Sequence, residues 1–296
     1  MHTLKRFVQN NWVGYLFITP WLVGLIGLSA FPMGFSLYLA FTSYDLFSAP
    51  KWIGLGNFIE MFHDPKYTGS VGVTLHYVLI AVPLSLLFAL AVALLLNKGI
   101  RGLRIYRAIY YVPSLFGGSV AVALLWRQLF GGEGLLNSLL HLLGIEGMNW
   151  IATPGTALYT LILLSTWQFG SAMVIFLAGL KQIPHDLYES ARIDGAGTWK
   201  QFANITLPLL TPILFFNLVM QIIHAFQAFT PAFIVSGGTG GPLNSTLFYT
   251  LYLYQKGFAQ FQMGYAAAMA WMLLCTIAFV TSLLFATSRT WVYYQE

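Results

Sequence analysis

Three polar side chains on one helical face are best placed to hold a polar solute. Asn217, Gln221 and His224 are spaced i, i+4 and i+7, within about 60° of one another on a helix that turns 100° per residue. The small Ala228 continues this face, and Gln227 lies at its edge. Polar groups are costly toward lipid. The stripe is therefore either the wall of a hydrated pathway or a seam of hydrogen bonds between helices, each contributing about 0.6 kcal/mol.

Aromatic and amide residues in two other apolar segments could face the same cavity. Sugars present hydroxyl edges and apolar C–H faces, so amides beside aromatic planes suit a carbohydrate. Single tryptophans in such segments also serve as packing residues or as interfacial belt residues. The expected substrate-pathway set is Asn217, Gln221, His224, Gln227, Trp167, Gln168 and Trp271.

Other kinds of chemistry lack their usual residue patterns. His224 has no cysteine or carboxylate companion in its segment, so it is expected to donate a hydrogen bond rather than ligate a metal. The glycines between Ser236 and Pro242 lack the Gly-Lys-Ser/Thr ending of a phosphate-binding loop. No nucleophile elbow or carboxylate pair occurs at catalytic spacing. We expect no catalytic residue, no metal and no bound cofactor.

The composition places these residues in a membrane. The 296 residues are 58% hydrophobic and only 8% charged, with a mean hydropathy of +0.72, which excludes a soluble globule and a disordered chain. The basic residues form no continuous face, so nucleic acid is not an expected partner. Uncharged intervals predict one all-α membrane domain, residues 1–296, whose six spans lie near 12–40, 71–96, 108–130, 156–180, 208–235 and 263–287.

The charges also predict orientation and energy source. Basic residues concentrate on one side of the six spans: Lys5, Arg6, Lys98, Arg101, Arg104, Arg107, Lys181, Arg192, Lys200 and Arg289. The positive-inside rule then places both termini in the cytoplasm. The first apolar run exceeds a signal-peptide core, so it is read as an uncleaved span kinked at Pro20 and Pro32. No acidic or basic residue lies well inside a span, which disfavours ion coupling.

The loop 181–207, between the fourth and fifth spans, is unusually polar. Residues 181–208 hold six of the chain's 23 formal charges. Asp186 and Glu189 form a capping-box pattern for a short helix near 187–194, and Gly195 and Gly197 permit a turn after it. Thr198 is expected to cap a second helix, whose apolar stripe comprises Trp199, Phe202 and Ala203. Local physics allows either a plain connector or a lever that docks into a groove on a cytoplasmic partner.

The loop carries a family resemblance. Glu189-Ser-Ala191, Asp194-Gly195-Ala196 and Ile205-Thr-Leu207-Pro208 resemble the EAA signature of binding-protein-dependent ABC importer permeases, with nine residues between Gly195 and Ile205. Ser190 replaces the alanine that is usual at its position. Tyr-Val-Pro113 and the Ser236–Pro242 segment also look like the sugar and oligosaccharide branch.

The resemblance implies a type I, MetI-like permease fold with a cytoplasmic coupling helix. In that family the elbow inserts into a nucleotide-binding subunit, and closure of the ATPase dimer rocks the permeases between inward- and outward-facing states. The implied partners are a second, related permease, an ATPase dimer that hydrolyses ATP with Mg²⁺, and an extracytoplasmic solute-binding protein. The implied ATPase-coupling residues are Glu189, Ser190, Ala191, Asp194, Gly195, Ile205, Leu207 and Pro208.

These expectations converge on a carbohydrate importer, with an oligosaccharide as the expected cargo. Glycerol 3-phosphate and a uronate oligosaccharide are the alternatives within the class. A self-contained channel or a membrane-embedded enzyme is the rival from another class; either should work alone, without a separate ATPase.

Overall fold

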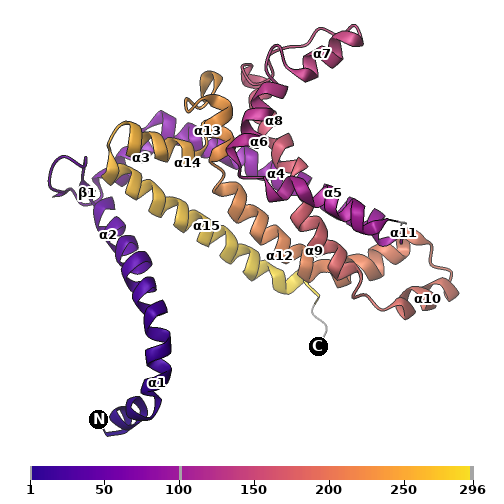
Figure 1. The fold of residues 1–296 in the computed structure, drawn as a ribbon, viewed down its shortest axis with the longest axis horizontal. Coiled ribbons are helices and arrows are strands. Elements are labelled where there is room, and N and C mark those ends of the chain that lie inside the picture. Colours follow the sequence, from indigo (N-terminus) through magenta and orange to yellow (C-terminus); the bar gives the residue numbers. More distant parts are fainter. Residues whose placement is uncertain (1, 100–101, 294–296) are drawn as a thin grey trace. The chain divides into compact units, whose positions relative to one another are not determined.

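Long helices dominate the computed structural model, which describes residues 2–99 and 102–293 (Figure 1). Arg101 and the side chains of Lys5 and Arg6, used above to predict the topology, lie outside the described residues. The chain divides into two units, Met1–His63 with Leu253–Met272, and Asp64–Tyr252 with Leu273–Glu296.

The first unit begins with a continuous helical run. It comprises α1 (His2–Gly24), a π-helical turn (Leu25–Ala30) and α2 (Phe31–Ala40). The π-helical turn ends two residues before Pro32, which lacks a backbone N–H. The run confirms the expected first span, since Gly14–Ala40 is long and apolar enough to cross a membrane.

A small polar junction follows this run. Strands β1 (Thr42–Ser43) and β2 (Lys51–Trp52) pair antiparallel, with Thr42 opposite Trp52, and α3 spans Gly56–His63. The buried Asn57 side chain donates to the carbonyls of Ala40 and Thr42, both at 2.9 Å. The bond to Ala40 satisfies a carbonyl at the end of α2, which the helix itself leaves unpaired.

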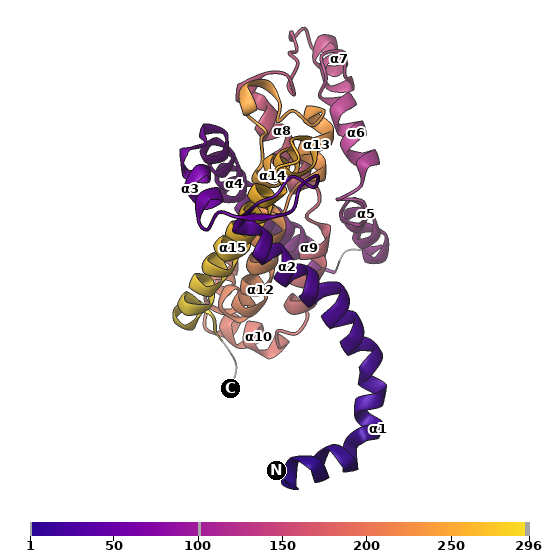
Figure 2. The ribbon, with the colours of Figure 1, turned by 90° about the vertical axis from the view of Figure 1, so that its left-hand side faces the viewer.

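The second unit is organised around α4 (Pro65–Asn97), which packs against α8 (Pro154–Trp167), α9 (Gly170–Leu180) and α12 (Leu207–Phe226) (Figures 1 and 2). Asp64 caps α4 by accepting from the backbone N–H of Lys66 at 2.9 Å. Small buried residues recur every four positions along it: Ala81, Ser85, Ala89 and Ala93. Small residues let membrane helices approach closely.

The expected third span, 108–130, is corrected by the structure. It consists of α5 (Leu103–Leu115) and α6 (Val120–Leu129), bent by 95°. Two consecutive glycines, Gly117 and Gly118, interrupt the helix, and Ser119 caps α6 by accepting from the N–H of Val122 at 3.2 Å. The described residues contain five candidate spans, or six when this bent pair counts as one.

Two other spans are interrupted locally. The fourth breaks between α8 and α9 at Gln168–Phe169, and the fifth breaks between α12 and α13 (Thr230–Ser236). Pro231 lies in the first turn of α13, where its missing N–H removes no helical bond. The sequence expectation of continuous helices over 156–180 and 208–235 missed both breaks.

The remaining helices are shorter or terminal. They are α7 (Leu135–Leu142), α10 (His185–Ile193), α11 (Thr198–Gln201), a π-helical turn (Phe202–Thr206), a 3-10 turn (Pro242–Asn244), α14 (Tyr249–Tyr254), a further π-helical turn (Gln255–Ala259) and α15 (Met263–Trp291). In both ribbon views, α10 and α7 lie at opposite ends of the second unit (Figures 1 and 2).

Candidate functional site

The loop 181–207 folds as the expected elbow. Helix α10 ends in a tight turn in which Gly195 adopts φ +78°, a conformation that costs other residues about 1–2 kcal/mol. The N–H of Gly195 donates to the carbonyl of Arg192 at 3.0 Å, and that of Ala196 donates to the carbonyl of Ala191 at 2.8 Å. This pair of bonds is a Schellman motif, so the predicted turn at Gly195 is confirmed.

The predicted caps of the two loop helices are wrong. Pro184 precedes α10, and Asp186 lies within its first turn without a capping bond from its side chain. Glu189 instead lies 3.7 Å from the ring of His185, one helical turn earlier, and both side chains are exposed. Gly197, extended at ψ 168°, occupies the cap position of α11 in place of Thr198.

Two hydrogen bonds hold the elbow together, and one of them reaches the residue that precedes α12. The hydroxyls of Tyr188 and Thr206 are 2.9 Å apart, and the Gln201 side chain donates to the carbonyl of Ala196 at 2.8 Å. Because Thr206 directly precedes α12, the bond from Tyr188 connects α10 to the start of that helix.

The elbow presents apolar side chains together with charges of both signs. The side chains of Ile193 and Trp199 are 87% and 83% exposed, and the Trp199 ring contacts Phe202 edge-on. Glu189, Ser190, Asp194 and Gly195 are exposed, whereas Ala191, Ile205, Leu207 and Pro208 are half-buried. Four of the eight motif residues are therefore exposed at the surface of the elbow, and the other four are half-buried.

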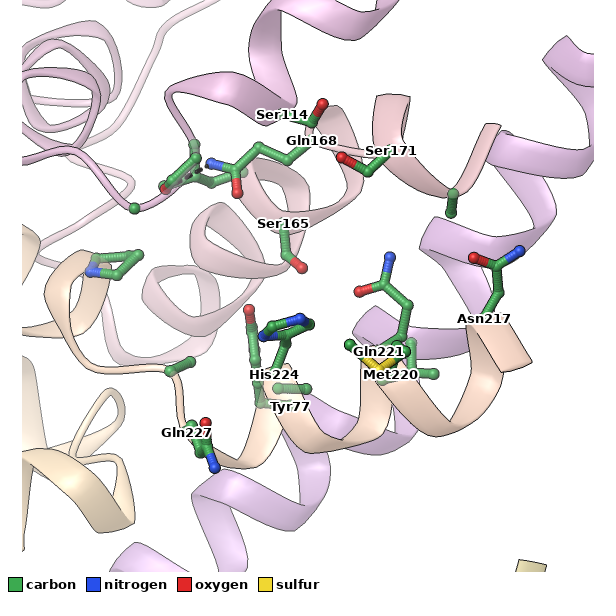
Figure 3. A pocket seen from close by; sticks show the side chains of 18 of the residues that line it. Tyr77, Ser114, Ser165, Gln168, Ser171, Asn217, Met220, Gln221, His224 and Gln227 are labelled. Atoms are coloured by element: carbon green, nitrogen blue, oxygen red, sulfur yellow. Dashed lines mark hydrogen bonds between the residues drawn. The ribbon is translucent and has the colours of Figure 1, made fainter. Parts of the chain in front are cut away.

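The polar stripe of α12 lines a cavity of about 580 Å³ within the second unit (Figure 3). Asn217, Gln221, His224 and Gln227 all line it, as does Gln168 from the break between α8 and α9. The structure thus brings together five of the seven expected pathway residues. Figure 3 shows Gln221 and His224 on α12 projecting toward the side that carries Gln168.

All three interrupted spans contribute to this cavity. Gly117 and Gly118 come from the α5–α6 break, Gln168 from the α8–α9 break, and Gln227 and Phe229 from the α12–α13 break. Backbone groups that leave a helix within a membrane are tolerated where they line a cavity or meet a polar side chain. The breaks therefore concentrate polar atoms at one place in the unit.

Gln168 connects two of the breaks. Its side-chain amide donates to the carbonyl of Gly117 at 3.1 Å, one of the carbonyls that the interrupted helix leaves without a helical partner. A Cβ atom at Gly117 would lie only 2.6 Å from the Gln168 Oε1 atom. A larger residue at position 117 would therefore displace the Gln168 side chain from this position.

Sequence reasoning missed the hydroxyl residues of this cavity. Ser114, Ser165, Ser171 and Tyr77 line it together with the amides. Serines scattered through apolar helices are common packing residues, so no pattern along the chain singled them out. No aspartate, glutamate, lysine or arginine is among the residues that line this cavity.

Asn217 has an unusual environment. Its side chain is only 3% exposed, and its amide nitrogen has no hydrogen-bond partner among the described residues. A buried unpaired donor is costly, about 1–3 kcal/mol, which fits a group that a polar solute or water satisfies.

Two expected pathway residues lie elsewhere. Trp167 lines a different cavity of about 550 Å³, where its ring lies 5.8 Å from that of Trp126. Trp271 is half-buried in α15 and belongs to the first unit.

Comparison with known proteins gives a consistent group of relatives. The family described as "Binding-protein-dependent transport system inner membrane component" matches residues 74–290. The probable ABC transporter permease protein YesP of Bacillus subtilis (strain 168) is 56% identical, covering 100% of this chain and 96% of that protein.

More distant relatives differ in the cargo that they are named for. The lactose transport system permease protein LacF of Rhizobium radiobacter is 30% identical, covering 97% of each chain. The sn-glycerol-3-phosphate transport system permease protein UgpA of Yersinia enterocolitica is 33% identical, covering 96% of this chain and 97% of that one.

A solved structure shares the fold. The chain of a bacterial alginate ABC transporter, solved with an alginate pentasaccharide-bound periplasmic protein, matches with a TM-score of 0.81 at 20% identity, covering 96% of both chains.

Proposed function

Because this chain belongs to the family of inner membrane components of binding-protein-dependent transport systems, we propose that it is a permease subunit of an ATP-driven carbohydrate importer. It is a transport component rather than an enzyme. We further propose that residues 1–296 act as one transmembrane domain by alternating access, and that both termini are cytoplasmic.

The cavity carries this proposal. It combines amides with serine hydroxyls and apolar surface. It also lies where one span is bent by 95° and where two others each break between two helices. Sugar hydroxyls exchange hydrogen bonds with amides and hydroxyls, and sugar C–H faces suit the apolar walls. A solute crossing here would form hydrogen bonds with the polar groups that the helix breaks leave unpaired.

The uncharged cavity favours a neutral glycan over a phosphorylated cargo. Glycerol 3-phosphate would need a compensating cation, yet no lysine or arginine lines the cavity. The relative named for lactose and the alginate transporter of like fold support a saccharide, and an oligosaccharide is our preferred cargo. A uronate oligosaccharide stays an alternative, as does glycerol 3-phosphate, for which UgpA is named.

The elbow is proposed as the coupling element. Ile193 and Trp199 would enter a groove on an ATPase subunit, with Glu189 and Asp194 facing polar or basic groups beside it. ATP bound with Mg²⁺ by that partner would supply the energy. Because Tyr188 is bonded to Thr206 at the start of α12, movement of α10 would displace the helix that carries Asn217, Gln221 and His224.

The full assembly would contain a second, related permease, an ATPase dimer and an extracytoplasmic solute-binding protein. The family description names the binding protein as the element on which transport depends. We expect that protein to perform most of the substrate selection.

Copurification and reconstitution test this function. The tagged chain should retain an ATPase when extracted gently, and its reconstituted complex should hydrolyse ATP faster with a saccharide-loaded binding protein. Uptake by the chain alone, or ATP turnover insensitive to any loaded binding protein, would contradict the proposal. Stimulation by glycerol 3-phosphate instead of saccharides would retain the importer and change its cargo.

A further inference from the structure

A second cavity, of about 570 Å³, lies between α5 and α9. Its lining includes Arg104, Arg107 and Tyr111 from α5, and Ser171 and Val174 from α9. The pathway residues do not account for it, since none of Asn217, Gln221, His224 or Gln168 contributes to its wall.

The two arginines form an uncompensated positive pair. They are three residues apart on one helical face, a spacing at which like charges repel. Arg104 is exposed and Arg107 is half-buried. In the described part of the chain, neither guanidinium has an ion-pair partner. An anion between them would relieve the repulsion and could be held by both planar donor groups.

The membrane depth of this pair identifies the anion. Arg104 and Arg107 lie in the first two turns of α5, where the bent span begins at Leu103. A span terminus lies at the level of the phospholipid headgroups, and long basic side chains reach toward that layer. Basic pockets between membrane helices at this level bind anionic lipid headgroups.

The rest of the cavity matches the apolar part of a lipid. Ala108, Val174 and Ile175 give it an aliphatic wall, and Tyr111 offers both a ring and a hydroxyl. We propose that the cavity binds one anionic phospholipid, with its phosphate between Arg104 and Arg107 and an acyl chain along Val174.

The site also borders the solute cavity. Ser171 and Ile175 line both cavities, so the bound lipid would contact the same segment of α9 that faces the solute. We expect anionic lipid to change the rate of transport; this consequence alone rests on the proposed function.

Lipid binding by the full-length chain tests the site without requiring transport. The chain is extracted from its membrane and placed in phosphatidylcholine nanodiscs. The phosphatidylglycerol that the chain still retains is then measured by native mass spectrometry. The double variant R104Q/R107Q should lose affinity for phosphatidylglycerol by about thirtyfold. Val174→Phe should also reduce binding, because it fills the acyl part of the cavity and leaves both charges in place.

Arg127→Gln is the matched control. Arg127 is exposed at the other end of the same bent span and does not line this cavity, so its variant should bind phosphatidylglycerol as the wild type does. If R104Q/R107Q fails to insert into the membrane, the phosphatidylglycerol binding of Val174→Phe tests the site instead. Wild-type binding in Val174→Phe, or equal losses in Arg127→Gln, would overturn the site.

Competition by soluble anions distinguishes a lipid site from a site for an anionic group of the cargo. Inorganic phosphate and galacturonate, each added at millimolar concentration, should leave lipid retention unchanged. If either displaces phosphatidylglycerol from the wild type but not from R104Q/R107Q, the pair binds a soluble anion and the lipid assignment is wrong.

Discussion

The elbow at residues 181–207 and the cavity wall on α12 are adjacent in the chain but are built by different kinds of interaction. The elbow is held by bonds between residues at most 18 positions apart, such as Tyr188 with Thr206. The cavity joins groups separated by 51 positions, as in the bond from Gln168 to Gly117. Local motifs therefore reveal the elbow, whereas the cavity depends on how helices pack.

In the proposed transport step, the two regions would have separate roles. The elbow places apolar groups outward, with Trp199 83% exposed, as an element that meets another protein does. The cavity places polar groups inward, with Asn217 only 3% exposed. Helix α12 begins at the first region and lines the second, so it is the physical connection between them.

Gly195→Val should have the largest effect on the elbow. A β-branched residue at φ +78° is strained by at least about 1–2 kcal/mol, so the turn should rearrange and uptake should fall to background. Substrate uptake by the reconstituted complex is the measurement, with membrane insertion of the variant chain as the check that it is in place.

Gly197→Val is its matched control. A Cβ atom at either glycine meets no other atom within 4 Å, and Gly197 has an ordinary φ of −70°. Uptake should be largely retained in this control. Equal losses in both variants would show that surface bulk, rather than backbone conformation, matters at the elbow.

Gly170→Ala tests whether the cavity depends on close helix packing. A Cβ atom there would lie 2.3 Å from the carbonyl oxygen of Tyr110 and 2.8 Å from the Cα atom of Tyr111. Overpacking of this kind costs about 1–3 kcal/mol, so the apparent Tm in detergent should fall by several degrees, roughly as that loss implies.

Gly155→Ala provides the comparison, since its Cβ atom would meet nothing within 4 Å. Its Tm should stay unchanged or rise slightly, because alanine favours helix over glycine. An unchanged Tm in Gly170→Ala would mean that α5 and α9 adjust without cost.

Gln221→Leu should impair the cavity and spare the elbow. Loss of a hydrogen bond to the solute costs about 1.4 kcal/mol, so uptake at low solute concentration should fall about tenfold, while the ATPase still copurifies. Met220→Leu is the control, since Met220 lines the same cavity without a hydrogen-bonding amide. Normal uptake by Gln221→Leu would favour the interhelical seam for the polar stripe.

Tyr188→Phe should have the smallest effect. It removes the bond to Thr206, which contributes about 0.5–1.5 kcal/mol, and keeps the ring. Stimulated ATP turnover should fall a few-fold, whereas saccharide binding by the external protein is unaffected. If stimulation persists in full, the connection from α10 to α12 does not pass through this bond.

The sequence alone predicted much of the elbow because its determinants are local. Helical spacing, a glycine at a turn and the EAA-like residues all lie within 28 positions. The errors were local too: Asp186 and Thr198 are one or two residues inside the helices that they were expected to cap. Cap position depends on where the preceding chain enters, which residue type does not specify.

The six apolar segments and the stripe of α12 also follow from the amino-acid sequence, because apolar length and helical period are properties of the chain itself. Tertiary structure decided that three spans are interrupted beside one another, that Gln168 bonds to Gly117, and that Trp167 lines a different cavity. Periodicity states which residues share a helical face. Which neighbouring helix that face meets is set by close approach at particular glycines and by the pairing of backbone groups freed at breaks.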